Sequence, residues 1–584
     1  MNRSQRRAAK KQNPAGGLPS ATPAQAPGVD LFALAVQHHD RGELTPAVEL
    51  YKTILDRTPS HAAASERLAL IYLAQGKRDK ASVQYAALAR HVPQSLGSYV
   101  RIVETLKNLI PDLAPAFTNA STASLVYLLK KPGVENCTSI AGNDYFRCAL
   151  ESTVARDVAL ERWLTALRAE ILGAALADEP PTDDELLAFS AALAQQCFIN
   201  EYVFAVAPDE RQLAERLKGL VVDAVAQATT IHPLRLISLA MYLPLHTLPG
   251  GSAIAERSWP GPAAAVVTQQ VLEPIEERQL RASMPRLTAI GGGVTAQVRQ
   301  QYEENPYPRW VRLNAPPATL RILDDYIRQQ FPTAQYRPVG RRDSLDILEA
   351  GCGTGRHALE VTQAYRGARV LAVDISLASL ASAKRKTPPA LAGTIEFAQA
   401  DIMSIGSIGR SFDLINSGGV LHHMGDPLAG WCELLKLLKP NGLMQIGLYS
   451  AHARREIVAA RKIIAKRGYP STPEGIRRCR QDLFNGPEQF KFMAMSDFFS
   501  TSDCRDLLFH VQEKQFTIPE IKEFLTENNV KFIGFDFPRT IHQHHQRVFA
   551  NAGWSIGNLD RWDAYERANP DIFMNMYALW MQKN

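Results

Sequence analysis

The run from Asp346 to Gly355, DILEAGCGTG, constrains the fold more than any other part of this chain. An apolar stretch leads to an acidic residue, Glu349, and glycines then follow at alternate positions: Gly351, Gly353 and Gly355. Glycine is needed where backbone takes positive φ or lies against a ligand with no Cβ between them. A helix predicted from Arg356 to about Ala364 turns its free N–H groups toward the same spot and favours an anionic group there. The run therefore predicts a strand, a tight turn and a helix around a nucleoside whose tail carries a carboxylate.

The glycine spacing separates the kinds of nucleotide site. A dinucleotide fingerprint needs G-x-G-x-x-G, but Arg356 follows Gly355 directly, so the third glycine falls one residue early. A P-loop is excluded because no Gly-Lys-Ser/Thr follows. The pattern E-x-G-x-G-x-G resembles the first motif of class I S-adenosylmethionine-dependent methyltransferases. The resemblance implies that Glu349 and the three glycines bind that cofactor.

Two further strand ends carry acidic residues. The apolar strand RVLAVDIS ends at Asp374, where a carboxylate can accept both hydroxyls of a ribose, and Ile375 follows it. The next unit, TIEFAQADIMS, ends its strand near Phe397 and places Asp401 in the loop behind it. In the family that this chain resembles, the residue at Asp401 contacts the adenine amino group, and the next side chain, Ile402 here, packs on the ring. These four residues are therefore expected in the cofactor site.

The remaining pattern completes an α/β fold. A fourth strand with its loop (412–424), a helix (427–438) and a fifth strand (443–449) follow in turn. Alternating strands and helices predict a parallel doubly wound sheet with ligands outside the carboxyl ends of the strands. The resemblance adds a helix (517–529), a sixth strand (530–537) and an antiparallel last strand (576–582). We expect a Rossmann-like class I methyltransferase domain over 294–584, with an insertion at 451–516 that acts as a lid or substrate platform.

Three histidines are candidates for catalysis. Displacement at a sulfonium methyl needs in-line positioning and a dry cavity, and it needs a base only when the acceptor is protonated. His422 and His423 lie in the loop after the fourth strand, nearest the reactive methyl, and His510 closes the insertion, with Asp503, Asp506 and Glu513 near it to orient it. Each of these histidines could instead have only a structural role. The arginine-rich helix at 454–467 is interpreted as a solvated face.

The loop after the fourth strand also bears on the acceptor. Enzymes that methylate amino groups of bases or amides commonly carry N/D-P-P-Y/F there, whereas this chain has Asn416-Ser417-Gly418-Gly419. This difference counts against that class and leaves oxygen, carbon and other nitrogen acceptors open. The acceptor itself is unidentified, and the sequence does not decide between a protein and a small molecule.

A proline-rich segment, VRQQYEENPYPRW from Val298 to Trp310, precedes the nucleotide fold. Its prolines enforce an extended stretch. It resembles a run found in tetratricopeptide-repeat methyltransferases. In class I methyltransferases, a segment just ahead of the core often folds over the cofactor. We expect Tyr302 and Arg309 to contact the methionine carboxylate or the acceptor. A rigid hinge between domains is the alternative.

An internal repeat of 34 residues lies near the N-terminus. Gly42, Ala47, Tyr51 and Pro59 recur as Gly76, Ala81, Tyr85 and Pro93, which is the tetratricopeptide period with matching residue types. The pattern predicts two helical hairpins over 30–94 that present a groove to a protein or peptide partner, or else form a brace or dimer contact. Two repeats are too few to stand alone, so helices of the middle region (95–293), which shows helical periodicity, must cover their open end.

Composition bounds the remaining possibilities. Residues 1–29 are basic, then rich in proline and alanine, and are expected to be disordered. A net charge of +6 over 584 residues is too mild to predict a nucleic-acid partner. Seven scattered cysteines without C-x-x-C fit a reducing cytoplasm and predict neither disulfides nor a metal site. No apolar run is long enough to predict a membrane span.

Two classes of function compete. One is an active methyltransferase that uses S-adenosylmethionine and whose repeats recognise a partner or the acceptor. The other is a non-catalytic, partner-binding scaffold that retains the methyltransferase fold. The first is favoured because a lapsed site has no physical reason to keep the acidic and glycine positions together.

Overall fold

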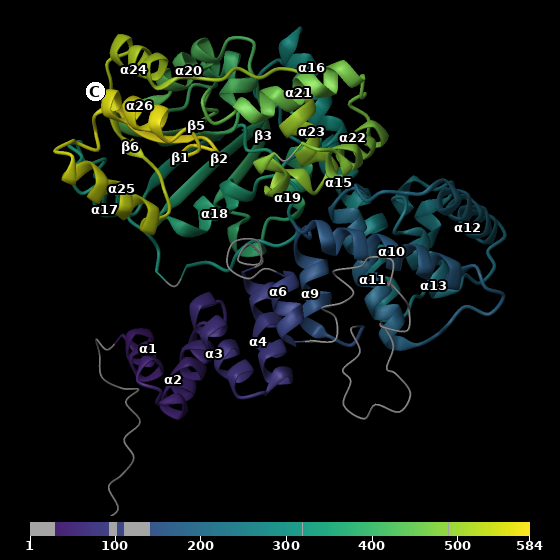
Figure 1. Cartoon of the computed structure of the whole chain (residues 1–584). Coiled ribbons are helices and arrows are strands. Elements are labelled where there is room, and N and C mark those ends of the chain that lie inside the picture. Colours follow the sequence, from purple (N-terminus) through teal and green to yellow (C-terminus); the bar gives the residue numbers. More distant parts are fainter. Residues whose placement is uncertain (1–29, 93–101, 110–140, 318, 489, 584) are drawn as a thin grey trace, which may run out of the picture.

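The computed structural model describes residues 30–92, 102–109, 141–317, 319–488 and 490–583 (Figure 1). The tail at 1–29 and Pro93 of the second repeat lie outside the described residues. In Figure 1 the N-terminal helices lie to one side of a sheet domain formed by the C-terminal half. None of the helices in the described part of the chain combines the length and apolar character needed to span a bilayer.

The N-terminal segment forms two helical hairpins. Their helices are α1 (Leu31–Asp40), α2 (Leu44–Arg57), α3 (Ala62–Ala74) and α4 (Arg78–His91). Gly42 and Gly76 lie in the two turns with φ of 75° and 71°, a conformation that favours glycine. Ala47 and Ala81 are fully buried in α2 and α4. The repeated positions therefore have the same roles in both hairpins.

Helices of the middle region cover the open side of the second hairpin, as expected. Tyr85 of α4 packs on Tyr145 of α9, with ring centroids 5.6 Å apart. Described residues from Ala35 to Val271 share one hydrophobic core, so packing continues across the expected boundary near residue 95. The helices of this region are α6 (Ile102–Leu109), α9 (Asp144–Ser152), α10 (Val158–Ala175), α11 (Asp184–Ile199), α12 (Pro208–Ala226), α13 (Pro233–Leu239), α14 (Gly261–Val267) and α15 (Glu273–Ala282), with the short turns η5 (Leu245–Thr247), η6 (Gly251–Ile254) and η7 (Thr268–Leu272).

The sheet has seven strands in the order β3-β2-β1-β4-β5-β7-β6. Strand β7 is antiparallel to β5 and β6, and the other pairs are parallel, which confirms the Rossmann-like arrangement with an antiparallel last strand. The order reverses between β1 and β4, where such sheets open a ligand crevice. The strands are β1 (Leu345–Ala350), β2 (Ala368–Asp374), β3 (Ile395–Gln399), β4 (Phe412–Gly418), β5 (Leu438–Leu448), β6 (Val530–Phe535) and β7 (Tyr577–Lys583).

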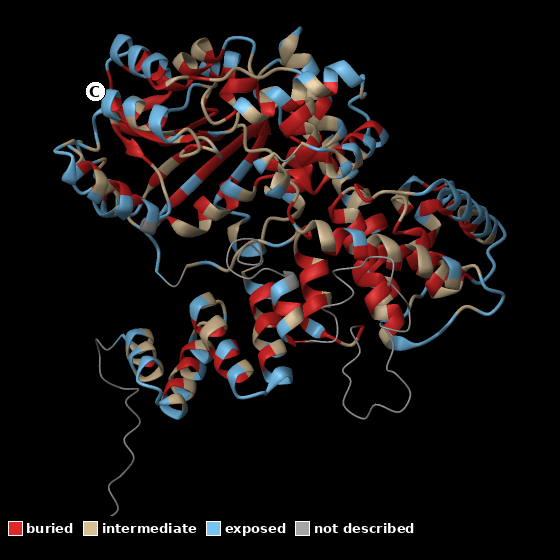
Figure 2. Ribbon diagram, viewed as in Figure 1, coloured by how far each residue is buried: buried red, intermediate tan, exposed pale blue. Residues whose placement is uncertain are grey.

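Both faces of the sheet are covered, as Figure 2 shows by the buried strands. Successive residues of a strand point to opposite faces. Accordingly Ile347 packs into a core with helices α17, α18 and α19, whereas Leu348 packs into a core with α20, α24 and α26. The helices of this half are α16 (Val294–Glu304), α17 (Leu323–Gln330), α18 (Arg356–Ala364), α19 (Leu377–Arg385), α20 (Pro427–Lys436), α24 (Ile518–Glu527), α25 (Arg539–Asn551) and α26 (Leu559–Ala568), with the short turns η8 (Pro389–Leu391), η9 (Ile402–Ile408) and η10 (Leu421–His423).

The fifth strand begins earlier than predicted. A turn is expected at 439–442, but β5 starts at Leu438 and absorbs that turn as an irregularity opposite Phe412 and Leu414. Asn441 takes a φ of 59°, which asparagine tolerates better than most residues. The strand therefore bends instead of stopping.

The insertion at 451–516 is helical and joins the two halves of the chain. Its own core includes Val154 and Ile199 of the middle region. Arg480 of the insertion forms a fully buried ion pair with Glu161 of α10, at 2.8 Å. The insertion therefore packs the sheet domain against the middle helices. Its elements are α21 (Arg455–Arg467), α22 (Pro473–Asn485), α23 (Thr501–Phe509), η11 (Lys491–Ala494) and η12 (Ser496–Phe498).

Candidate active site

A cavity of about 490 Å³ opens at the carboxyl ends of β1, β2 and β4. The volume suits a cofactor and a small acceptor group. Among the residues expected in the site from the sequence, those that line it are Tyr302, Glu349, Gly351, Gly353, Asp374, Ile375, Asp401, Ile402 and His423. The topology therefore brings together residues that are up to 121 positions apart in the chain, from Tyr302 to His423.

The glycine turn follows β1 with positive φ at Gly351, Gly353 and Gly355. A Cβ on Gly353 would lie 2.3 Å from the carbonyl oxygen of Tyr307, and one on Gly351 would lie 2.4 Å from Val420. Tyr307 and Val420 also line the cavity, so a side chain at either glycine would clash within its wall. Gly355 does not line the cavity; it caps α18 and lies against Ala383.

Asp374 ends β2 with its carboxylate fixed by backbone. Its two oxygens accept hydrogen bonds from the N–H groups of Gly353 and Ser376, each at 2.8 Å. Burial raises the pKa of Asp374 to about 6. Each carboxylate oxygen has a second lone pair, so this group can still accept ribose hydroxyls.

Asp401 is placed in the same way at the end of β3. Its carboxylate accepts the N–H groups of Gly291 and Met403, both at 2.9 Å. Gly291 belongs to the glycine linker ahead of α16, so that linker closes this end of the cavity. The sequence pattern predicts neither this contact nor the place of Thr295 in the cavity wall.

Glu349 is held between two side chains at the start of the turn. Asn416 donates to one carboxylate oxygen at 2.5 Å, and the Nδ1 of His357 lies 2.9 Å from the other. The Glu349 carboxylate raises the pKa of His357 to about 9, so this pair is ionic at neutral pH. His357 and Asn416 both line the cavity but were not expected there. The sequence offers no signal for them, because each contact depends on how α18 and β4 pack against β1.

Of the two residues predicted ahead of the core, the structure brings only Tyr302 to the cavity. Arg309 lies over the ring of Phe198, 5.5 Å from its centroid, and 3.9 Å from Glu201. It lines a separate cavity between the middle helices and the sheet domain. Phe198 and Glu201 hold Arg309 on that side, so the expectation that it contacts the methionine carboxylate or the acceptor is wrong.

The three histidines occupy different places. His423 lines the cavity. His422 is fully buried behind it, with its ring stacked on Tyr449 at 3.8 Å. His510 lies in a second layer, stacked on His423 with ring centroids 3.6 Å apart. Only His423 is therefore positioned to meet an acceptor.

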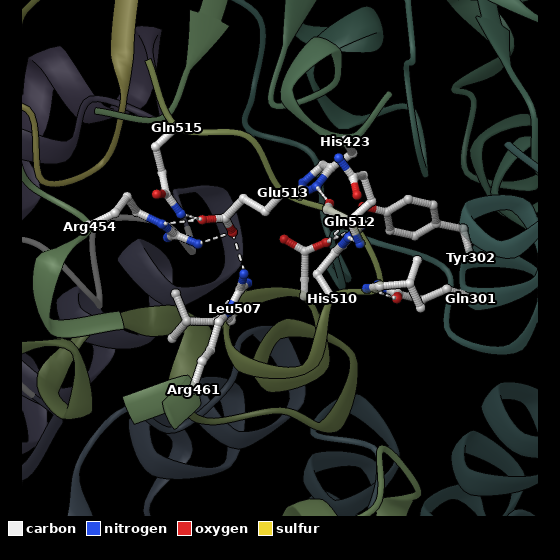
Figure 3. Close-up of polar contacts among 12 residues, drawn as sticks. Gln301, Tyr302, His423, Arg454, Arg461, Leu507, His510, Gln512, Glu513 and Gln515 are labelled. Carbon is white, nitrogen blue, oxygen red and sulfur yellow. Dashed lines mark hydrogen bonds and ion pairs between the residues drawn. The ribbon is translucent and has the colours of Figure 1, made fainter. Parts of the chain in front are cut away.

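The backbone of one residue, Gln512, sets the tautomers of two of these rings (Figure 3). The carbonyl of Gln512 accepts the Nδ1–H of His423 at 2.8 Å, and the N–H of Gln512 donates to Nδ1 of His510 at 3.1 Å. These bonds leave a lone pair on Nε2 of His423 and a proton on Nε2 of His510. Burial lowers the pKa of both rings, that of His510 to about 2, so both are neutral at pH 7. A neutral imidazole with a free lone pair at the cavity wall can take a proton.

The same cluster bears on metal binding. One ligand atom from each of His423, Asp506 and His510 lies within 4.8 Å of the others. The two rings are stacked 19° from parallel, so their in-plane lone pairs do not converge on one point. Nε2 of His510 also carries the proton. This arrangement suits proton transfer better than metal binding.

Buried charges support the cavity wall from behind. Arg454 donates to both carboxylate oxygens of Glu513, at 2.6 and 3.2 Å, and Arg461 joins at 2.8 Å (Figure 3). Although burial opposes it, these two arginines lower the pKa of Glu513 to about 2. The Arg454 guanidinium also lies 3.8 Å from the ring centroid of Tyr449, which lines the cavity. The interpretation of 454–467 as a solvated face is therefore wrong for Arg454 and Arg461.

Comparisons with known proteins agree with this geometry. The family model of a methyltransferase domain matches residues 348–446. The uncharacterized protein syc1184_c from Synechococcus sp. is 27% identical over 274 residues, 44% of this chain and 63% of that protein. The demethylmenaquinone methyltransferase of Clavibacter sepedonicus is 34% identical over 133 residues (22% and 51%). The ubiquinone biosynthesis O-methyltransferase of Cereibacter sphaeroides is 31% identical over 123 residues (20% and 49%).

The similarity is confined to part of each protein. The chain spans less than two thirds of the length of these relatives. Among solved structures, PKMT2 from Rickettsia typhi aligns with a TM-score of 0.35 and 14% identity, over 46% of this chain and 54% of that one. The family match lies on the glycine turn, Asp374 and Asp401. The chain therefore carries a class I methyltransferase domain whose cofactor is S-adenosylmethionine.

Proposed function

We propose that this protein transfers a methyl group from S-adenosylmethionine to an acceptor that must lose a proton, with His423 as the base. The observation that carries the proposal is the neutral His423, whose free Nε2 belongs to a side chain on the wall of the cofactor cavity. His422 and His510 support this ring from behind.

Different residues would bind the cofactor and shield the reacting atoms from water. Bound S-adenosylmethionine supplies a methyl on a cationic sulfur, which is already a good leaving group. Asp374 would hold the ribose, Asp401 and Ile402 the adenine, and the glycine turn with Glu349 the methionine end. The segment carrying Tyr302 and the insertion carrying His510 keep water from the reacting atoms, where a dry site strengthens electrostatic effects.

We infer that the acceptor atom is a hydroxyl oxygen on an uncharged, aromatic or apolar molecule. The wall of the cavity that holds His423 carries tyrosines, methionines and an aliphatic group: Val298, Tyr302, Tyr307, Met424, Tyr449 and Met576. Both ring faces of Tyr449 are occupied, one by His422 and the other by Arg454, so it does not offer a face to an ammonium acceptor. A relative named as a ubiquinone biosynthesis O-methyltransferase favours an oxygen acceptor, and one named as a demethylmenaquinone methyltransferase favours an apolar acceptor molecule.

We propose in addition that the hairpins at 30–94 are tetratricopeptide repeats that bind a protein or peptide partner. The 34-residue spacing and the equivalent roles of the repeated positions support this assignment. Leu70 of α3 and Val83 of α4 are exposed by 48% and 55% and are suited to touch a partner. In cross-linking with cell extract, L70D/V83D should lose a product that wild type forms. An unchanged pattern would favour a brace.

The enzymatic proposal is tested by incubating cell extract with methyl-labelled cofactor and separating protein from small-molecule fractions. Wild type should label an apolar small molecule in an alkali-stable form, and H423Q should not. Calorimetry with S-adenosylhomocysteine should show equal affinity for both proteins. Cofactor binding without labelling of any fraction would favour the non-catalytic scaffold, and label in protein alone would refute the small-molecule acceptor.

A further inference from the structure

Asp506 of α23 lies at the cofactor cavity, although it comes from the insertion and not from the sheet domain. A carboxylate oxygen of Asp506 lies within 4.8 Å of a ring nitrogen of His423. The same oxygen that Tyr302 contacts lies 3.8 Å from Nε2 of His510. The insertion therefore places a carboxylate beside the base.

Tyr302 holds this carboxylate in place. Its hydroxyl donates to Oδ1 of Asp506 at 2.7 Å and receives the Nε2–H of His510 at 3.1 Å. Figure 3 shows Tyr302, His423 and His510 around the Gln512 peptide. Tyr302 belongs to α16, ahead of the sheet, so two segments from outside the core meet at one point. The chain of donors runs from His510 through Tyr302 to Asp506.

Asp506 has no permanent cation to balance it. Within the described residues, no arginine or lysine lies at ion-pairing distance from its carboxylate, and its histidine neighbours are neutral. A buried carboxylate without a cation is costly. Protonation of His423 would supply the missing charge at the moment when a proton leaves the acceptor. Such a contact is stronger in the transition state than before it, which is the condition for catalysis.

We propose that Asp506 is the charge partner of His423, held in place by the Tyr302 hydroxyl, and that it stabilises the imidazolium formed during methyl transfer. This inference rests on the proposed function. In the step, the acceptor oxygen forms a bond to the methyl carbon, the S–C bond breaks and its electron pair stays on sulfur. The hydroxyl proton moves to Nε2 of His423 and passes to solvent after the products leave.

Other groups face His423 but do not replace Asp506. His422 and His510 pack on its ring, and Tyr449, directly after β5, meets it edge-on. The charges behind them, Arg454, Arg461 and Glu513, form an ion-paired cluster. Asp497 and Arg454 also act electrostatically on Asp506. Because a carboxylate oxygen of Asp506 lies within 4.8 Å of a ring nitrogen of His423, the basicity of His423 should be most sensitive to Asp506.

The test is a pH titration of the His423 ring by NMR of protein labelled at histidine ¹³Cε1, assigned by the signal lost in H423Q. In D506N the pKa of His423 should fall by about one unit or more relative to wild type, because an opposite charge at this range shifts a pKa by that amount. D506E should restore it in part, and Y302F should lower it by less than D506N. An equal pKa in wild type and D506N would overturn the proposal.

Two controls distinguish a charge pair from a damaged cofactor site and from a bound metal. S-adenosylhomocysteine should bind D506N within about twofold of wild type, and if D506N fails to fold, the pKa of His423 in Y302F against wild type decides the question. Stoichiometric Zn²⁺ that shifts His423 and His510 together in wild type but not in D506N would make the cluster a metal site and overturn the proposal. If the pKa responds as expected but no extract fraction is methylated, the charge pair stands and the proposed enzymatic activity fails.

Discussion

The ionisation state of the Asp374 carboxylate should determine the affinity of this protein for its cofactor. Two ribose hydroxyls that donate to an ionised carboxylate are worth about 1.5–3 kcal/mol each, so D374A should lose about 3–6 kcal/mol. That loss corresponds to a dissociation constant about 10² to 10⁴ times higher. D374N keeps one oxygen acceptor and should lie between wild type and D374A.

The pH dependence follows from burial of the same group. Its pKa of about 6 in the free protein means that the carboxylate is ionised at pH 8 and mostly protonated at pH 5. Affinity should therefore fall as pH falls through 6, by about tenfold between pH 8 and pH 5 if only the ionised form binds well. D374N has no ionisation here and should lose this dependence.

Calorimetry with S-adenosylhomocysteine from pH 5 to 8 would measure both effects. D325N changes an exposed aspartate of α17, paired only with Arg328 among the described residues, and is the matched control. It should retain the wild-type affinity and its pH dependence. A flat pH profile in wild type, or wild-type affinity in D374A, would refute the assignment of Asp374 to the ribose.

Three further results are expected. H423Q should lower the rate of methyl transfer about 10²-fold or more in an assay with saturating cofactor, since general bases contribute that much; an unchanged rate would remove His423 from the chemistry. G353A should lower the melting temperature by several degrees, because its Cβ would meet the Tyr307 carbonyl at positive φ, while G393A, where the added Cβ meets open space, should not. R480A should lower the free energy of unfolding in denaturant by about 3–5 kcal/mol, because it leaves Glu161 buried and unpaired. R211A breaks the exposed pair with Glu474 and should lower it by at most about 1 kcal/mol. Equal losses in the two variants would contradict this account.

The sequence predicts the parts of this site that depend on local pattern. The glycine turn, Asp374 and Asp401 follow directly from strand ends and from backbone conformations that only certain residues adopt. His422 and His423 are adjacent and chemically alike, so only packing against Tyr449 and Gln512 decides which one faces the cavity. The prediction for Arg309 fails for a related reason, because the side to which this side chain points is decided by its packing against Phe198 and Glu201.

The contacts of Glu349 and Asp506 depend on how segments that are far apart in the sequence pack together. Asn416 and His357 reach Glu349 only after β4 and α18 have packed beside β1. Tyr302 and Asp506 are 204 positions apart and meet through a hydrogen bond between segments that lack any shared motif. A single sequence contains no periodicity or spacing that marks such pairs.

The insertion packs on Val154 and Ile199, and Arg480 finds its counterion in Glu161; all three of these partners precede residue 294. A polypeptide cut at 294 would keep every cofactor ligand, yet it would leave α23 without the surface that fixes Asp506 and His510. The C-terminal half is thus not an autonomous module: His423, Asp506 and His510 all belong to it, but the position of α23 depends on packing against the middle region.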